Sequence, residues 1–292
     1  MADIENIQWF PGHMAKTRRK ISEDLKKVDA IVEVLDARAP LSSGNPEVES
    51  IISSKPRLIV LGKTDLADAV QTENWIKFYH AQNMACVSFS IKSKGDIKDF
   101  KNETEKLMHE KLARWKLRGM VGRSLKLMVV GIPNVGKSAI INRLIGGAKA
   151  KVENRPGVTR SSQWFSSKIG FQILDTPGVL WPKFEDQNAA LNLAFMGSIK
   201  DHILDIESLA VQLIERIKND YISNICERFK ISESDFQNLE QQNLLITIAK
   251  KRGMISPGGK ADTLRAANTI LEEFRLGKLG KITLEKAIFK KS

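Results

Sequence analysis

The sequence contains little cysteine and few aromatic residues. Two cysteines, Cys86 and Cys226, occur among 292 residues, and aromatic side chains make up 7% of the chain. The cysteines lie far apart in apolar surroundings and match no metal-ligand spacing, which argues against a disulfide framework and against a zinc site. We therefore expect buried, reduced thiols and a cytoplasmic location.

Long apolar runs, leader peptides and internal repeats are also missing from the pattern. No stretch approaches the ~18 uninterrupted apolar residues that a membrane span needs. The first residues, MADIENIQWFPGHM, have neither the apolar core of a signal peptide nor the Arg- and Ser-rich character of a transit peptide. We expect a chain that begins with functional sequence and has no stable association with a membrane.

Charged residues are plentiful, and most of them are positive. The chain has 46 Lys and Arg against 34 Asp and Glu, a net charge of +12, and a pI near 9.6. This balance favours a polyanionic partner, with nucleic acid as the first candidate. At roughly 150 residues per domain, the length predicts two domains.

Apolar β-rich runs alternate with helix-forming segments over the first two thirds of the chain. The runs DAIVEVLDAR, RLIVLGK, MACVSFS and LKLMVV are suited to buried strands, and one helix is expected from about 97 to 115. Alternation of this kind indicates a mainly parallel sheet. Beyond about Lys200 the strand signal fades, and amphipathic helices such as LRAANTILEEF take over.

A phosphate-binding loop follows the fourth of these runs. Residues Gly131 to Ser138, GIPNVGKS, fit GxxxxGK[ST] between a predicted strand and a predicted helix, which is the context that this motif requires. Backbone N–H groups of such a loop point at phosphates, Lys137 reaches the β and γ oxygens, and Ser138 offers a hydroxyl to Mg²⁺. The nucleotide-binding prediction covers Asn134, Val135, Gly136, Lys137, Ser138 and Ala139.

A second phosphate-side motif, DTPG, closes a later strand. Asp175 stands where a nucleotide triphosphatase places the aspartate that holds Mg²⁺ through water, and Gly178 could donate its backbone N–H to the γ-phosphate. Thr159, in the preceding segment RPGVTR, is predicted to add a second hydroxyl to the metal. An ordinary loop threonine is the alternative for Thr159, since such residues are common in turns.

The guanine-reading loop comes before the phosphate loop in the sequence. In VLGKTDLAD, Asp65 can accept from both N1–H and the exocyclic amine of guanine, with the stem of Lys63 along the base, and the motif also includes Gly62 and Thr64. The segment SIK at the next strand end supplies Ser90 and Lys92. Ordinary GTPases have these motifs after DxxG, so the reversed order indicates a circular permutation, which is tolerated when the new ends fall in exposed loops.

The whole set of motifs resembles the circularly permuted ribosome-assembly GTPases of the ribosome biogenesis GTPase A (YlqF) family. The resemblance runs from IQWFPGHMAK through DAR, GIPNVGKS, RPGVT, DTPG and WPKFED to the helical tail. It implies GTP and GDP as ligands with Mg²⁺, and a factor acting late in maturation of the large ribosomal subunit in contact with its rRNA. A low intrinsic hydrolysis rate, stimulated by the subunit, and a monomeric state are expected.

The resulting fold prediction is an α/β, circularly permuted P-loop GTPase domain followed by a small all-α C-terminal domain. The GTPase domain is expected at 1–200, with a base-reading half at 28–113, a connector at 114–124 and a phosphate-binding half at 125–200. The basic helical domain at 201–292 is expected to bind RNA. Its predicted RNA-binding residues are Lys250, Lys251, Arg252, Lys260, Arg265, Arg275, Lys278 and Lys281.

Gly62 departs from the family pattern, which has Asn or Thr at the start of the base motif. A glycine has no side chain to brace the phosphate loop, and a lost hydrogen bond costs on the order of 1 kcal/mol. We expect guanine preference to survive through Asp65, with weaker affinity. If bracing is what is missing, Gly62→Asn should restore it.

The segment after DTPG lacks the usual catalytic glutamine. Val179 follows DTPG where many GTPases have a water-orienting glutamine, and the resemblance points instead to His13. His13 can serve as base or water anchor near neutral pH, or it can belong to a packed N-terminal cap. Asn134 is expected from the resemblance to help hold K⁺, with a loop-capping asparagine as the alternative.

Two functions from different classes follow from these motifs. The first is a GTP-hydrolysing assembly factor whose nucleotide state controls docking on rRNA. The second is an RNA-binding module that uses guanine nucleotide as a structural ligand, with incidental hydrolysis. A membrane-surface GTPase is disfavoured because the basic tail has few bulky aromatic residues.

Overall fold

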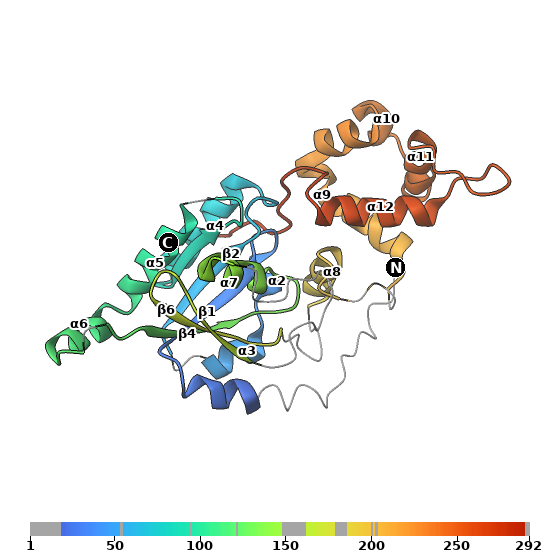
Figure 1. Cartoon of the computed structure of the whole chain (residues 1–292). Helices are drawn as coiled ribbons and strands as arrows, with labels where there is room; N and C mark the ends of the chain where they lie inside the picture. The colour runs from blue at the N-terminus through green and yellow to red at the C-terminus, as the bar shows by residue number, and fades with distance from the viewer. Residues whose placement is uncertain are drawn as a thin grey trace.

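The structure, a computed structural model, places a helical region beside a sheet region (Figure 1). It describes residues 19–52, 55–93, 95–120, 122–147, 162–178, 186–199, 201 and 204–289, apart from the side chains of 47–49. Within these ranges, no helix combines the length and the apolar character needed to cross a membrane.

Six strands form one sheet in the order β3-β2-β1-β4-β6-β5. All neighbouring pairs are parallel except β5 with β6. The strands are β1 (Ala30–Asp36), β2 (Arg57–Gly62), β3 (Ala85–Phe89), β4 (Leu125–Val130), β5 (Gln163–Ser166) and β6 (Phe171–Asp175). The prediction of a mainly parallel sheet is confirmed. The three strands that come first in the sequence all lie on one side of β4, and the two that follow β4 lie on its other side, as a permuted chain requires.

Helices cover both faces of the sheet, which explains why the central strands are continuous apolar runs rather than alternating ones. Alternate side chains of β1 point to opposite faces of the sheet. Val32 and Val34 join one large core with Phe100 and Ile140, whereas Ile31 and Leu35 join two smaller apolar clusters. The surrounding helices are α2 (Pro40–Ser43), α3 (Pro46–Ile52), α4 (Ala69–Ala81), α5 (Asp96–Leu107), α6 (His109–Leu117), α7 (Lys137–Ile145) and α8 (Gln187–Phe195).

The helix expected from 97 to 115 differs in detail from the structure. It is two helices, α5 and α6, which meet at Met108, whose ψ of 12° closes the first of them. Helix α6 continues to Leu117, so the first residues of the predicted connector at 114–124 are helical. Trp115 of α6 is buried, and the guanidinium carbon of Arg123 lies 4.5 Å from the centroid of the Trp115 ring. This cation–π contact ties the connector back to the helix.

The helical region is built from α9 (Ile206–Phe229), α10 (Glu233–Gln237), η3 (Gln241–Asn243), α11 (Leu244–Lys251) and α12 (Thr263–Arg275). Aspartates cap two of these helices: Asp205 accepts from the N–H of Ser208, and Asp262 accepts from that of Arg265. Apolar residues of α9, α11 and α12 belong to the same continuous core as the phosphate-loop side of the sheet. After α12 the chain runs back onto the sheet region, where Figure 1 marks the C-terminus.

Candidate nucleotide-binding site

The phosphate loop joins β4 to α7, and its backbone requires glycine at two positions. Gly131 has φ of 148°, and a Cβ there would lie 2.5 Å from the carbonyl oxygen of Val34. Gly136 has φ of 101° and directly precedes the first turn of α7. Asn134 also has positive φ, 64°. The left-handed residues turn the loop so that it ends at a helix N-terminus, which is the arrangement that binds phosphate.

Lys137 is held on the inside of this loop. Its Nζ donates to the carbonyl oxygens of Gly131 at 2.9 Å and Ile132 at 2.7 Å. Burial lowers the pKa of Lys137, while the nearby carboxylate of Asp175 opposes that change. The ammonium is therefore fixed at the position from which it can reach phosphate oxygens. Ser138 and Ala139, the next residues of α7, are half-buried.

Asp175 and Gly178 lie against the phosphate loop. The hydroxyl of Thr176, between them in the sequence, donates to the carbonyl oxygen of Val129 at 2.7 Å and fixes the segment to β4. A Cβ on Gly178 would come within 2.9 Å of both the Lys137 Nζ and the Pro133 backbone nitrogen. Only glycine can pack this closely against the phosphate loop. The close packing brings the Gly178 backbone next to the Lys137 ammonium.

The carboxylate of Asp175 fits a divalent cation. Its Oδ1 is buried and, among the residues that the structure describes, has no hydrogen-bond partner. Burial raises the pKa of Asp175, and Lys137 counteracts part of that rise. Over the same residues no group of three His, Cys, Asp or Glu side chains could hold a metal by itself. A single carboxylate next to Lys137 of the phosphate loop therefore suits Mg²⁺, which keeps several waters and takes further oxygens from phosphates.

The base-reading loop touches the phosphate loop directly. A Cβ on Gly62 would lie 2.9 Å from the carbonyl oxygen of Val135, and one on Gly136 would lie 3.8 Å from Cγ of Lys63. Residues that are about seventy positions apart in the sequence are thus neighbours, because β2 and β4 flank β1 and both end at the same edge of the sheet. Thr64, the next residue, is half-buried.

The close approach at Gly62 changes the expectation for Gly62→Asn. Gly62 has ordinary strand geometry, so its backbone does not need glycine. Glycine is needed instead because there is no room for a side chain: the atom nearest to an added Cβ is a main-chain oxygen rather than the end of a flexible side chain. An asparagine here would first have to displace the phosphate loop, and the simple restoration of a missing brace does not fit this structure.

The SIK segment lies beside the base-reading loop, as the motif predicts. Lys92 Nζ is 2.9 Å from Asp65 Oδ2, and the Lys92 N–H donates to the Ser90 hydroxyl oxygen at 3.1 Å. Arg143 of α7 donates to the carbonyl oxygen of Ser93 at 3.1 Å. The helix that starts at the phosphate loop therefore also supports the loop that follows β3.

Asp36 and Arg38, which were quoted only as part of the family resemblance, form a buried charge cluster with Lys63. Arg38 donates to both Asp36 oxygens at 2.9 Å, and Lys63 Nζ is 3.2 Å from Asp36 Oδ2. Burial alone would raise the pKa of Asp36, but the two cations hold it well below its usual range. Burial lowers the pKa of Lys63, and Asp36 partly restores it. Arg38 also lies over the ring of Phe274 in α12, at 5.1 Å from the centroid.

The phosphate loop is linked to α12 through the end of α8. Asn134 Nδ2 donates to the carbonyl oxygen of Gly197 at 2.6 Å. Arg275 of α12 donates to the carbonyl oxygens of Ala194 and Phe195, which belong to the same helix end, and pairs with Asp201 at 2.7 Å. The amide of Asn134 thus makes an interloop bond rather than capping its own loop.

These contacts revise two of the predicted RNA-binding residues. All three nitrogens of the Arg275 guanidinium donate hydrogen bonds within the protein, to the α8 carbonyl oxygens and to Asp201. Arg252 donates to Glu273 at 3.1 Å, inside an ion-pair cluster with Arg228. Both are structural cations, so sequence counting overestimated the free positive charge. The other six are exposed: Lys250, Lys251, Lys260, Arg265, Lys278 and Lys281.

Other predicted residues lie outside the described part of the chain. These are His13, Thr159 and Val179, and nothing in the geometry bears on them. Cys86 and Cys226 are buried free thiols, as expected.

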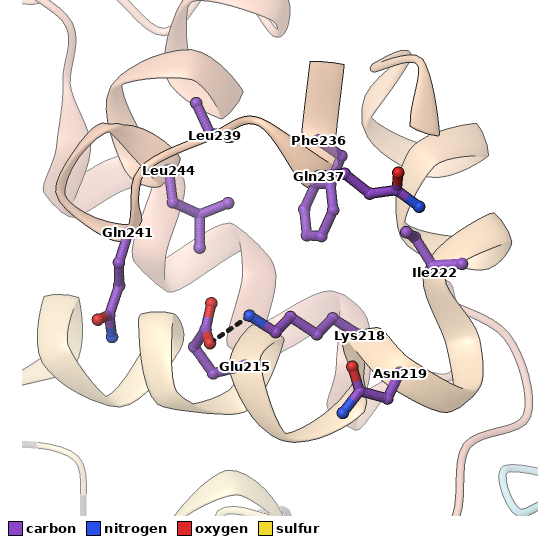
Figure 2. A pocket seen from close by; sticks show the side chains of 9 residues that line it. All are labelled: Glu215, Lys218, Asn219, Ile222, Phe236, Gln237, Leu239, Gln241 and Leu244. Atoms are coloured by element: carbon purple, nitrogen blue, oxygen red, sulfur yellow. Dashed lines mark ion pairs between the residues drawn. The ribbon is translucent and has the colours of Figure 1, made fainter. Parts of the chain in front are cut away.

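A cavity in the helical region lies apart from the nucleotide residues. It measures about 320 Å³ and lies between α9 and the α10–α11 segment, with Phe236 and Leu244 among its apolar walls. Lys218 and Glu215 form an ion pair along one wall, as Figure 2 shows. Asn219, Gln237 and Gln241 add amide groups at its rim.

Comparisons with known proteins agree with this geometry. The family model described as 50S ribosome-binding GTPase matches residues 126–251. A ribosome biogenesis GTPase A of Bacillus cereus is 42% identical over 279 residues, covering 96% of this chain and 93% of that protein. A GDP-bound YlqF structure is 26% identical with a TM-score of 0.66, covering 92% of this chain and 99% of that one. A GNP-bound YlqF structure from Thermotoga maritima is 27% identical with a TM-score of 0.63, covering 93% and 98%.

Proposed function

Because the chain belongs to the ribosome biogenesis GTPase A (YlqF) family, we propose that this GTPase is an assembly factor acting late in maturation of the large ribosomal subunit. Its nucleotide state would control docking on rRNA. The observation that carries the proposal is the contact between two loops: Gly62 and Lys63 of the base motif pack directly on Val135 and Gly136 of the phosphate loop. One guanine nucleotide can span both.

The residues around the γ-phosphate have separate roles in hydrolysis. Lys137 binds the β and γ oxygens, and the Gly178 N–H is positioned to follow the γ-phosphate. Mg²⁺, held by Ser138 and through water by Asp175, with Thr159 as a further ligand, would neutralise charge on the phosphates. His13 is the proposed water-orienting group. Substituting His13 by Ala should lower single-turnover hydrolysis without changing GTP affinity.

A monovalent cation is a further proposed participant. Since Asn134 Nδ2 is engaged with Gly197, the amide oxygen is the atom that would coordinate K⁺ beside the phosphates. The cation would stabilise developing charge as a fixed positive group does. Turnover in KCl should exceed turnover in NaCl at equal ionic strength, and Asn134→Ala should remove the difference.

The link between nucleotide and docking is supported by the path from the phosphate loop to α12. Bound GTP would order the segment after Gly178, which leads into α8, and α8 is joined to both Asn134 and Arg275. Loss of the γ-phosphate would release that segment. This is the order-to-disorder type of switch that GTPases use.

The rRNA-binding surface is proposed to be the six exposed cations of the helical region. Lys250, Lys251, Lys260 and Arg265 surround the turn between α11 and α12, whereas Lys278 and Lys281 lie past the other end of α12. Thirteen helical residues separate the two groups by about 20 Å. Contacts this far apart suit a polyphosphate backbone better than a small anion.

The decisive experiment is binding to purified large-subunit precursors with GDP or with a non-hydrolysable GTP analogue. We expect tighter binding with the analogue, and loss of that difference in Asp175→Asn. Binding indifferent to nucleotide would contradict the switch. The alternative function is an RNA-binding module with incidental hydrolysis. GTP turnover measured with and without precursor distinguishes it from the assembly GTPase, because the alternative predicts no stimulation of turnover by the precursor. We further propose a cytoplasmic monomer with no stable membrane association, which sedimentation and liposome flotation would test.

A further inference from the structure

The segment that follows α12 returns to the sheet region and lies along the base-reading loop. The Ile282 N–H donates to the carbonyl oxygen of Leu66 at 3.1 Å, and the Asp68 N–H donates to Thr283 Oγ1 at 3.1 Å. Leu66 and Asp68 lie one and three positions after Asp65, so two backbone groups of the guanine-reading loop are paired with the segment after α12. Figure 1 shows this red segment crossing from the helical region to the sheet.

The same segment also holds the loop that follows β1. The Leu284 N–H donates to the carbonyl oxygen of Arg38 at 2.7 Å. The Glu285 carboxylate accepts from the N–H groups of Leu41 at 2.7 Å and Ser42 at 3.0 Å. Its own carbonyl oxygen accepts from Trp75 Nε1 at 2.9 Å. Thus Ile282 to Glu285 bond to both loops that meet at Lys63 and Asp36.

Close packing accompanies these hydrogen bonds. Ile282 and Thr283 are 1% and 5% exposed. Gly277 has φ of 72°, and a Cβ there would lie 2.7 Å from Leu66 Cδ2. A buried N–H or C=O that loses its partner is costly. Loss of this segment would therefore leave two backbone groups of the base-reading loop without these partners.

We propose that the C-terminal segment Ile282 to Glu285 is part of the guanine site, with Thr283 and Glu285 as positioning residues for Asp65. The inference rests on the proposed role of Asp65 in binding guanine. Because GDP and GTP carry the same base, loosening this loop weakens the binding of both nucleotides equally. Since the segment begins beside Lys278 and Lys281, the RNA surface and the base-reading loop share one stretch of chain.

The first test is Thr283→Val, which removes the acceptor for the Asp68 N–H and keeps the side-chain shape. Thr269→Val is the matched control, because Thr269 Oγ1 bonds only within α12, to the carbonyl oxygen of Arg265. The readout is the Kd for GDP and for inosine diphosphate, which lacks the exocyclic amine that Asp65 accepts from. A merely destabilising substitution lowers the folded fraction and leaves the ratio of the two affinities unchanged.

We expect Thr283→Val to raise the Kd for GDP about fivefold, the equivalent of one lost hydrogen bond, with a smaller rise for inosine diphosphate. Single-turnover hydrolysis of bound GTP should stay within twofold. Glu285→Gln, with exposed Glu272→Gln as its control, should act in the same direction. An unchanged Kd for GDP, or an unchanged ratio between the two ligands in both variants, would overturn the proposal.

Asp65→Ala, measured in parallel, separates this inference from the function on which it rests. If Asp65→Ala leaves guanine affinity intact, the assignment of the base site itself is wrong. If Asp65→Ala abolishes it while Thr283→Val and Glu285→Gln bind GDP as the wild type does, only the positioning role is refuted.

Discussion

The carboxylate of Asp65 is paired with the ammonium of Lys92 at 2.9 Å, although the two residues follow different strands. The Asp65 side chain is 18% exposed and that of Lys92 is 72% exposed, so the pair is open to solvent on one side. An ion pair of this kind adds little to stability. Its value is positional, because it directs the carboxylate that is proposed to meet the base.

Asp65→Asn should change the base specificity of nucleotide binding from guanine to xanthine. An amide cannot accept from both guanine donors, so we expect GDP affinity to fall about 100-fold, for two hydrogen bonds to a charged group. Xanthine has a carbonyl where guanine has its amine, and the new amide can donate to it. Nucleotide Kd values for GDP and xanthosine diphosphate test this; a variant that prefers GDP would contradict it. Lys92→Gln, which removes the ion-pair partner of Asp65 and keeps the carboxylate, should change Tm only slightly.

Gly62→Ala and Gly62→Asn should both weaken nucleotide binding. A Cβ at this position overlaps the Val135 carbonyl oxygen, and overpacking of this kind costs about 1–3 kcal/mol. Gly147→Ala is the matched control, since a Cβ on Gly147 meets no atom within 4 Å. GDP titration and thermal unfolding measure the effect. Tighter binding by Gly62→Asn would restore the bracing explanation and show that the loops can separate.

Asp36→Asn should lower the free energy of unfolding at pH 7. It should also make that free energy less dependent on pH in the acid range. The cations hold the folded pKa of Asp36 below the unfolded value of 3.8. Its contribution is therefore complete above pH ~5 and is lost as pH falls through the unfolded pKa toward the folded one. Breaking this buried cluster should cost about 3 kcal/mol at pH 7.

Urea unfolding at pH 7 and at pH 3 measures that change. The difference between wild type and Asp36→Asn should narrow at the lower pH. Asp99→Asn, at an exposed position of α5, should show no such pattern. An equal loss of stability at both pH values would mean that the charge of Asp36 is not what stabilises the cluster.

Lys281→Gln and Arg275→Gln should affect RNA binding in different ways. Lys281 is exposed, and each phosphate contact removed should lower the slope of log K against log salt concentration by about one. Arg275 instead joins α12 to α8, so its substitution should lower Tm and leave the salt slope unchanged. Precursor-rRNA binding over a range of KCl concentrations separates the two. A lower salt slope in Arg275→Gln would show instead that Arg275 contacts RNA phosphates.

Local patterns predicted the nucleotide loops well because each depends on a few adjacent residues. The phosphate loop needs a strand, glycines at fixed places and a helix start, and all three are contiguous in GIPNVGKS. The mainly parallel sheet followed from the alternation of apolar β-rich runs with helix-forming segments, whereas the order of its strands came from the structure. The break at Met108 was missed because MHEK contains no glycine or proline to signal it.

Long-range polar contacts could not be predicted from sequence. The pairing of Arg275 with α8 carbonyls joins residues about eighty positions apart, and a basic residue on a basic helix gives no sign that it is internally satisfied. The bonds of Thr283 and Glu285 span more than two hundred positions. Gly62 was interpreted as a loss of function because the atom that requires it, the Val135 carbonyl oxygen, belongs to a distant loop.

Helix α12 carries its two anchoring side chains next to each other, Phe274 under Arg38 and Arg275 on the end of α8. Both anchors lie at the end of the helix nearest the sheet, and the turn with Lys260 and Arg265 lies at the far end, about 20 Å away. A tilt of ~10° about the anchored end would displace that turn by about 3 Å. If the proposed function is right, a small rearrangement at the phosphates that tilts the helical region as a unit would move the basic turn into or out of register with an RNA backbone.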